Sequence, residues 1–482
     1  MSSTPNLGEL AEWGLEIDFL VAKEKNGSAS WRGEEKDYRW SCPEFEPKPQ
    51  EACAKCCAEM VQKYALRQQL AKGGVGYCDR VASPNEKNFT VLESASKRHA
   101  LPPSMCTWLF SASPTAVSLP TSPQKLDWVG IKVRSPFKPL LDVMPSGLPY
   151  TPSSASLEST ESSWPETDPS LPPSPAPDTW ARLEIENVLG VLRNSVKMHV
   201  NSTCQVRIHY TLRREGFDLV EAKKMLTLCW MMEPELLLKL RTGVRDPKRN
   251  HFLPITTSSK IAKVPTKFRK GYMEETPDDC ERLLGQTRPI AAPEADEMDQ
   301  YIPNFNDSHL QERIQAIWGA NSLSELADLI TSPDGETTIA IHVPGAKLSP
   351  TMEFRYAVWH PHKEAMGHWL RLLGRLFFYS MGSSSEEFKE MIADIEVRLL
   401  ECKKCEVQDR WKTLLAYQFD STMCYFWETS FKNEELPGKS LSPENLDSQG
   451  ILDRVSGVAC VSIVDSESNS DSTSDSYSST SS

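Results

Sequence analysis

Four short apolar stretches, far apart along the chain, each carry two ionisable residues that are separated by a single residue. The four pairs are Glu16/Asp18, Lys132/Arg134, Arg207/His209 and Glu353/Arg355. Because successive side chains of a β-strand point to opposite faces, each pair lies on one side of a strand, and apolar neighbours such as Ile17 and Val133 lie on the other. The pattern predicts a sheet with an apolar core face and an open charged face. A charged face of this kind is suited to hold metal ions and phosphates.

The net charge of the chain is concentrated in two segments of low complexity. The 482 residues carry a net charge of −13. Residues 144–178 are rich in Pro and Ser and contain five acidic residues without Lys or Arg, and residues 465–482 are rich in Ser and contain four. These nine charges leave −4 on the rest of the chain, so no positive field favours DNA or RNA, and we expect no nucleic-acid partner. Both segments lack the apolar content needed to fold, and we predict that they are disordered and available to protein partners.

The sequence lacks the signals of a membrane or secreted protein. No run approaches the roughly 18 apolar residues of a membrane helix, and the first residues lack the basic-then-apolar layout of a secretory signal. We therefore expect a cytoplasmic protein without a membrane partner, in which the 13 cysteines are mostly buried thiols. Cys53/Cys56 and Cys402/Cys405 have the spacing of a four-cysteine zinc site, but both pairs fall in predicted helices, which favours buried thiols.

Hydrophobic periodicity predicts an α+β fold in which helices flank an antiparallel sheet. Apolar residues at steps of three and four predict helices over 51–70, 185–192, 218–233, 308–320, 322–330, 363–379, 385–402 and 409–417. Alternation predicts strands over 15–19, 128–133, 204–210, 338–343 and 352–359, the last two as a hairpin. Pro234 is expected to interrupt the helix that precedes it. These elements place one domain in two parts, 10–143 and 179–432, separated by a disordered acidic insertion, 144–178, and followed by a disordered acidic tail, 433–482.

Four motifs in order carry a resemblance to a known family. The motifs are Trp13-Gly14-Leu15-Glu16-Ile17-Asp18-Phe19, Asn201-Ser202-Thr203-Cys204-Gln205-Val206-Arg207-Ile208-His209, Val244-Arg245 followed by Asn250, and Thr351-Met352-Glu353-Phe354-Arg355. This set resembles the amidoligase family, which comprises carboxylate-amine ligases with a glutamine-synthetase-like fold. The resemblance extends from about residue 12 to about residue 381. It implies a cup-shaped antiparallel sheet that holds ATP and Mg²⁺ on its charged face between flanking helices.

The resemblance also implies a reaction and a set of residues. Such enzymes transfer the γ-phosphoryl group of ATP to a carboxylate, and an amine then attacks the acyl phosphate. The substrates would be small-molecule, peptide or protein carboxylates and amines. The implied Mg²⁺ ligands are Glu16, Asp18, His209 and Glu353; the implied catalytic residues are Glu353 and Arg355; and the implied contact to phosphate or substrate carboxylate is Arg245. Lys132 and Arg207 are candidates for cofactor binding on the same face, although the family pattern has other residues at their positions.

Among the positions that depart from the family pattern, two carry a positive charge. Lys132 stands where the family has a glutamate before Ser-Pro, and Arg207 stands where it has a histidine. A cation about 4 Å from Mg²⁺ repels it by several kcal/mol at an effective dielectric constant near 20. One interpretation is an active ligase in which the two cations replace one Mg²⁺ and neutralise phosphate directly. The alternatives are a catalytically degenerate protein that binds nucleotide or a protein partner, and a sheet in which the cations simply pair with acids on neighbouring strands.

Arg241 belongs to a basic loop for which the sequence leaves two interpretations open. With Arg245, Lys248 and Arg249 it forms a cluster of positive charge after the helix 218–233. Such a cluster is either a solvated surface or a site for phosphate or a substrate carboxylate.

Overall fold

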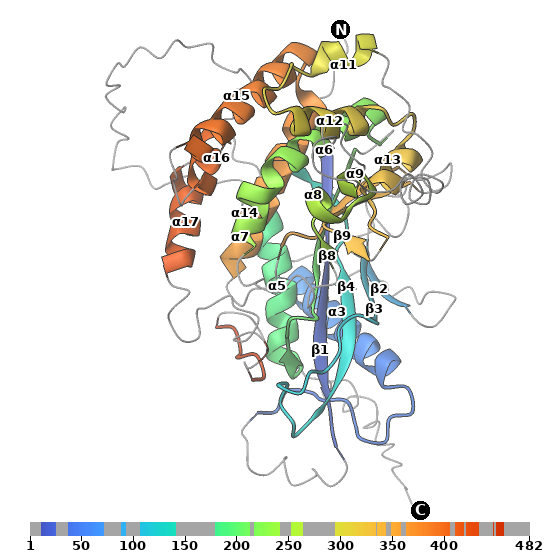
Figure 1. Ribbon diagram of the computed structural model, residues 1–482. Coiled ribbons are helices and arrows are strands. Elements are labelled where there is room, and N and C mark those ends of the chain that lie inside the picture. Colours follow the sequence, from blue (N-terminus) through green and yellow to red (C-terminus); the bar gives the residue numbers. More distant parts are fainter. Residues whose placement is uncertain are drawn as a thin grey trace, which may run out of the picture.

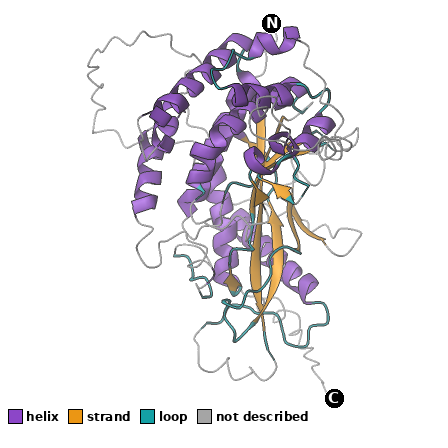
Figure 2. Ribbon diagram, viewed as in Figure 1, coloured by secondary structure: helices purple, strands orange, loops and turns teal. Residues whose placement is uncertain are grey.

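The computed structural model describes residues 11–25, 37–71, 88–92, 107–140, 179–212, 216–241, 252–263, 295–333, 335–343, 349–357, 363–404, 410–418, 421–432, 447 and 450–456. Within them the chain has the predicted α+β organisation, in which strands form a layer and helices pack beside it (Figure 2). The predicted insertion 144–178 lies outside the described residues. Among the helices that are described, none is long and apolar enough to cross a membrane.

A nine-stranded sheet forms the centre of the structure. Its strands are β1 (Ala11–Lys23), β2 (Asn88–Leu92), β3 (Thr107–Ala112), β4 (Asp127–Arg134), β5 (Lys138–Pro139), β6 (Met198–His199), β7 (Val206–Leu212), β10 (Ile339–His342) and β11 (Thr351–Phe354). They follow the order β10-β11-β7-β1-β4-β3-β2, and β5 and β6 also pair with β1. All neighbours in this sheet are antiparallel. The five predicted strands correspond to β1, β4, β7, β10 and β11, whereas β2, β3, β5 and β6 were not predicted.

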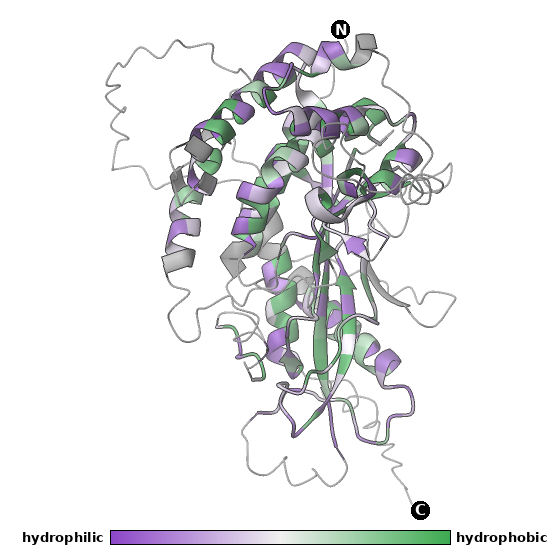
Figure 3. Ribbon diagram, in the orientation of Figure 1, coloured by the Kyte–Doolittle hydropathy of each residue, from purple (hydrophilic) through white to green (hydrophobic). Residues whose placement is uncertain are grey.

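The strand register places the predicted charged pairs on one face. Directly opposed residues are Glu16 with Arg134 and Arg207, Asp18 with Lys132, and Glu353 with His209. Since directly opposed residues point to the same side of a sheet, the pairs from β4, β1, β7 and β11 share a face. Figure 3 shows hydrophobic and hydrophilic residues following one another along the central strands, as this arrangement requires.

The opposite face of the sheet is the core. It is covered by α3 (Pro49–Ala71), beside which α5 (Thr179–Ser195) packs (Figure 1), and by α14 (Lys363–Gly382), which contacts β7. The Tyr210 hydroxyl donates to the Leu370 carbonyl of α14 at 2.8 Å, and the Tyr210 ring stacks on Phe377. Gly374 permits this close approach, because a Cβ atom there would lie 2.8 Å from the side chain of Leu140. Cys53, Cys56 and Cys204 are buried free thiols, as expected.

A long helical run follows β7. It begins with α6 (Leu219–Met232), which has a capping box between Asp218 and Glu221. The α-helix ends at Met232, as the predicted interruption at Pro234 requires, but the helical run does not stop there. The run continues through a π-helical turn, η3 (Glu233–Leu237), into α7 (Leu238–Leu240), because the wider turn accommodates the proline ring and its missing N–H near the first position.

Further helices and a small sheet complete the described structure. The helices are α8 (Ile255–Ser258), α9 (Lys260–Lys263), α11 (Ala295–Tyr301), α12 (Ser308–Trp318), α13 (Leu323–Ile330), α15 (Ser385–Lys404), α16 (Arg410–Gln418) and α17 (Ser421–Lys432). The predictions for α12, α13, α15 and α16 are confirmed, and α11 and α17 were not predicted. Two short strands, β8 (Phe252–Leu253) and β9 (Glu336–Thr337), pair in parallel beside the end of β10.

Part of the predicted disordered tail packs on the body of the protein. Leu452 is buried, and its N–H donates to the Met198 carbonyl at 2.8 Å. Asp447 accepts hydrogen bonds from the N–H and the hydroxyl of Ser202. The prediction of disorder over 433–482 was therefore wrong for these residues, which contain apolar side chains that the Ser-rich end lacks. The other tail residues lie outside the described residues.

Candidate functional site on the charged face

The charged face brings together seven of the eight predicted site residues. Glu16, Asp18, Lys132, Arg207, His209, Glu353 and Arg355 lie on β4, β1, β7 and β11 or directly after β11. Arg245 lies outside the described residues. The sequence predicted an open face, and this prediction was wrong. The face is largely buried: Asp18 is 1% exposed, Glu16 3% and Arg207 6%. Burial matters because each charge must then be matched by a partner or a ligand.

Glu16 is enclosed by cations. Its Oε2 atom lies 3.4 Å from Lys132 Nζ and 3.1 Å from Arg207 Nη1, and its Oε1 atom accepts hydrogen bonds from the guanidinium of Arg134. Burial alone would raise the pKa of Glu16, but His209 in its charged form, together with Arg134 and Lys132, outweighs burial and lowers the pKa to about 2. Glu16 is thus a carboxylate that holds three cations on the face.

One carboxylate oxygen of Asp18 accepts a hydrogen bond, and the other does not. Its Oδ2 accepts a hydrogen bond from Thr115 Oγ1 at 2.9 Å, whereas its Oδ1 is buried without a hydrogen-bond partner. Burial raises the pKa of Asp18 despite the nearby Arg207 and Lys132. The loop that carries Thr115 approaches the sheet over Gly130, where a Cβ atom would lie 2.6 Å from the Ser113 carbonyl oxygen.

Arg207, on β7, connects the acids of the two neighbouring strands, β1 and β11. Its guanidinium contacts Glu16, lies 4.0 Å from Asp18 Oδ2 and places Nε 3.4 Å from Glu353 Oε1. Burial lowers the pKa of Arg207, but these carboxylates raise it further than burial lowers it. Arg207 therefore sits where the family pattern has a metal-ligating histidine and neutralises the acids around it.

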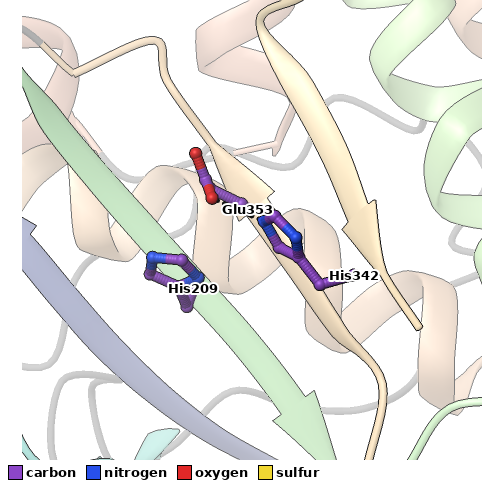
Figure 4. Close-up of side chains that lie close together, drawn as sticks. All are labelled: His209, His342 and Glu353. Carbon is purple, nitrogen blue, oxygen red and sulfur yellow. Dashed lines mark hydrogen bonds and ion pairs between the residues drawn. The ribbon is translucent and has the colours of Figure 1, made fainter. Parts of the chain in front are cut away.

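Glu353 lies between two histidines (Figure 4). Its Oε2 lies 2.6 Å from His342 Nε2, and the nearest ligand atoms of His209, His342 and Glu353 all lie within 4.8 Å of one another. His209 Nε2 is buried without a hydrogen bond, and burial lowers the pKa of His209 to about 4 against the opposing effect of Glu353 and Glu16. A neutral imidazole with an unused nitrogen is the form that binds a metal ion. Among the described residues, this is the one group with such spacing.

Arg355 is already paired. Its Nε donates to Glu353 Oε1, and its Nη1 lies 3.1 Å from the exposed carboxylate of Glu336 and 3.2 Å from the Thr337 carbonyl oxygen. Its Cζ atom also lies 5.0 Å from the centre of the Phe252 ring. In this arrangement Arg355 orients Glu353, and a phosphoryl group would have to displace a carboxylate to reach it.

The residues on this face fit a divalent cation at His209, His342 and Glu353, but not between Glu16 and Asp18. At the first place the ligands are two imidazoles and one carboxylate. This set suits Zn²⁺ or Mn²⁺ better than Mg²⁺, which prefers oxygen ligands. At the second place, between Glu16 and Asp18, Lys132 and Arg207 occupy the space next to the acids. A second metal ion does not fit there.

Sequence reasoning missed His342, although a signal was available. His342 alternates with Ile339 and Ile341 in a predicted strand, and it lies opposite Thr351, two residues before Glu353. Alternation alone therefore places it on the charged face. It was not predicted because it lies outside the sequence motifs that carry the family resemblance.

Comparisons of the chain with known protein families, with curated proteins and with solved structures found no match. The family resemblance consequently stands on the sequence motifs, and the function is inferred from the geometry of the face.

Proposed function

We propose that the protein is an ATP-dependent carboxylate-amine ligase that binds ATP and a divalent cation on the charged face. The observation that carries the proposal is the buried His209 Nε2 atom, which has no hydrogen-bond partner and belongs to the group of His209, His342 and Glu353, amid charges from four strands. Burying a polar atom without a partner costs free energy, so its presence supports a site that a bound ligand completes.

The reaction would proceed in two balanced steps. The substrate carboxylate oxygen attacks the γ-phosphorus of ATP, the bond to the β-phosphate oxygen breaks, and ADP and an acyl phosphate form. An amine then attacks the acyl carbon, an amide forms, and inorganic phosphate and a proton leave. Little covalent chemistry is required of the protein, whose contribution is positioning and neutralisation of charge.

The residues divide between metal binding and charge neutralisation. His209, His342 and Glu353 would hold the divalent cation, which when bound neutralises phosphate oxygens. Lys132 and Arg207 would contact phosphate oxygens in place of the second metal ion. The substrates would be carboxylates and amines of small molecules, peptides or proteins.

A second candidate function is a non-catalytic module that binds nucleotide or a protein partner. The enclosure of Glu16 by Lys132, Arg134 and Arg207 favours it, because a carboxylate that is matched by cations needs no metal ion. The glutamine-synthetase-like fold belongs to the first proposal and is supported by the antiparallel sheet with a charged face.

Thermal unfolding with and without ATP and Mn²⁺ or Mg²⁺ separates these possibilities. A ligand at 100 times its Kd stabilises a folded protein by about 2.7 kcal/mol, which is a measurable shift. No shift at millimolar nucleotide would refute nucleotide binding in both proposals. If a shift is found, phosphate release with pooled carboxylates and amines is the next measurement. Turnover that Glu353→Gln abolishes and that the control Glu336→Gln retains supports the ligase, and a shift without turnover supports the module.

A further inference from the structure

Arg241 is a buried arginine at the end of the run formed by α6, η3 and α7. Its backbone N–H donates to the Leu237 carbonyl at 3.1 Å, and its Cζ lies 5.8 Å from the centre of the Phe252 ring. The residue is 8% exposed, and its Nε atom has no hydrogen-bond partner. Within the described ranges, no carboxylate forms an ion pair with it. A guanidinium with five donors is thus held inside the protein without an anion.

The nearest buried acid is not available to Arg241. Glu233 accepts hydrogen bonds from the N–H groups of Ile255 and Thr256, and further bonds from hydroxyl groups, at 2.5–3.1 Å. The hydroxyl donors are Thr256, Thr338 and Tyr356. Both oxygens of Glu233 are therefore used to fix the π-helical turn against α8 and the strand region.

Arg355, in the same part of the fold, has a guanidinium that is paired with carboxylates. Arg355 lies against the same Phe252 ring and is bound to Glu353 and Glu336. Arg241 has the ring contact and lacks the acids. Two guanidinium groups therefore lie against the Phe252 ring. That of Arg355 forms ion pairs with carboxylates, and that of Arg241 forms none with a described residue.

Among the residues that the structure describes, none compensates the charge of Arg241 through an ion pair. Burial lowers the pKa of Arg241 to about 10, and the opposing effects of Tyr356 and Glu233 do not restore it. The end of a helix offers about half a negative charge, which is weaker than a carboxylate at a hydrogen-bond distance. A buried charge without a partner destabilises the folded state, so its position calls for a ligand.

We infer that Arg241, backed by the Phe252 ring, binds an oxyanion of the substrate, either a carboxylate or a phosphate group. The planar guanidinium fork matches both groups through paired hydrogen bonds. The assignment of this oxyanion to the substrate rests on the proposed function, whereas oxyanion binding itself does not. Arg241 and Arg355 both lie against the Phe252 ring, and Arg355 is bound to Glu353, so we expect the bound molecule to extend from Arg241 past Phe252 toward the charged face.

The test uses the full chain and the variants Arg241→Met, Arg241→Lys and Arg39→Met. Arg39 is the matched control, because it is equally buried but lies 2.7 Å from Asp37 and donates to the Arg193 carbonyl. Thermal unfolding is measured without ATP, first alone and then with L-glutamate, succinate, inorganic phosphate or pyrophosphate. Carboxylates and phosphates form separate arms that identify the source of the oxyanion.

The two methionine variants should behave in opposite ways. Arg241→Met should unfold at the wild-type temperature or above and bind the oxyanion at least about tenfold more weakly, since a charged hydrogen bond is lost. Arg39→Met should unfold at a lower temperature and bind the oxyanion like the wild type. Arg241→Lys, which keeps the charge but not the fork, should also lose at least about tenfold.

Several results would overturn the inference. They are a wild-type protein that binds none of the probes, an Arg241→Met variant that unfolds well below the wild type, and an Arg241→Lys variant with wild-type affinity. Oxyanion binding that depends on Arg241, in a protein that does not respond to ATP, would keep the inference and refute the proposed ligase.

Discussion

Glu16→Gln tests whether the cations on the charged face are held by this one carboxylate. The substitution keeps the shape of the side chain and removes the negative charge next to Lys132, Arg134 and Arg207. Lowering the pKa of Glu16 from 4.5 to about 2 corresponds to about 3 kcal/mol at about 1.36 kcal/mol per pH unit, and part of this requires the charged form of His209. Breaking a buried ion pair costs a similar 3–5 kcal/mol or so. Because the Arg134 side chain is 37% exposed and water screens its pair, we expect a loss of about 2–3 kcal/mol.

The assay is urea unfolding followed by tryptophan fluorescence in the presence of a chelator. Glu336→Gln is the control, because Glu336 also pairs with an arginine but its side chain is 51% exposed. An exposed pair contributes about 1 kcal/mol at most, so the control should lose little. Equal small losses in both variants would refute the view that Glu16 neutralises the face.

The pH dependence of this difference gives a second check. The pKa of Glu16 is lower in the folded protein than in the unfolded chain. Its stabilisation is therefore fully present above pH 4.5 and is lost as the pH falls toward 2. The difference in stability between wild type and Glu16→Gln should stay constant from about pH 7 to 5 and shrink below that range. A difference that shrinks on raising the pH instead would contradict the assignment.

Two further predictions concern histidines. Because two imidazoles and one carboxylate surround the candidate metal site, Zn²⁺ or Mn²⁺ should bind more tightly than Mg²⁺, and His342→Ala should weaken Zn²⁺ binding at least about tenfold in a competition titration with a chelating dye. Equal Zn²⁺ affinity in the variant would exclude His342 as a ligand. Burial lowers the pKa of His199, so the folded protein binds fewer protons at this residue than the unfolded chain does. The stability that is present above about pH 6.5 should therefore be lost as the pH falls, by up to about 1.4 kcal/mol per pH unit. Urea unfolding of wild type and His199→Gln between about pH 7.5 and 5.5 measures this, and parallel curves would show that His199 is not responsible.

The sequence predicts the charged face well because strand alternation is a local property. Spacing of two along β1 places Glu16 and Asp18 together whatever the neighbours are. It also predicts the helices with a clear apolar stripe, such as α14. Local periodicity fails where a segment gives a weak signal, as in β2 and β3, which are recognised as strands only because β3 pairs with β4 and β2 pairs with β3.

Which charges meet is a property of register, and this could not be predicted. Nothing near Lys132 in the sequence shows that it lies 3.4 Å from Glu16. The same holds for Arg241, whose isolation depends on Glu233 being used by groups from 255–256, 338 and 356. The π-helical turn at Pro234 could not be predicted either, since Glu233 fixes it through hydrogen bonds with residues far along the chain.

The role of Lys132 and Arg207 can be decided by the effect of Glu16 on nucleotide affinity. In the folded protein both cations are bound to Glu16, so a phosphate group must compete with this carboxylate for them. If the cations replace a metal ion, Glu16→Gln should release them and tighten ATP binding even as it lowers stability. If Glu16 is instead a metal ligand, the same variant should weaken ATP binding in the presence of Mg²⁺ or Mn²⁺ and leave it unchanged with a chelator. Titration of ATP under both conditions separates the two, and unchanged affinity in both would mean that phosphate does not reach this part of the face.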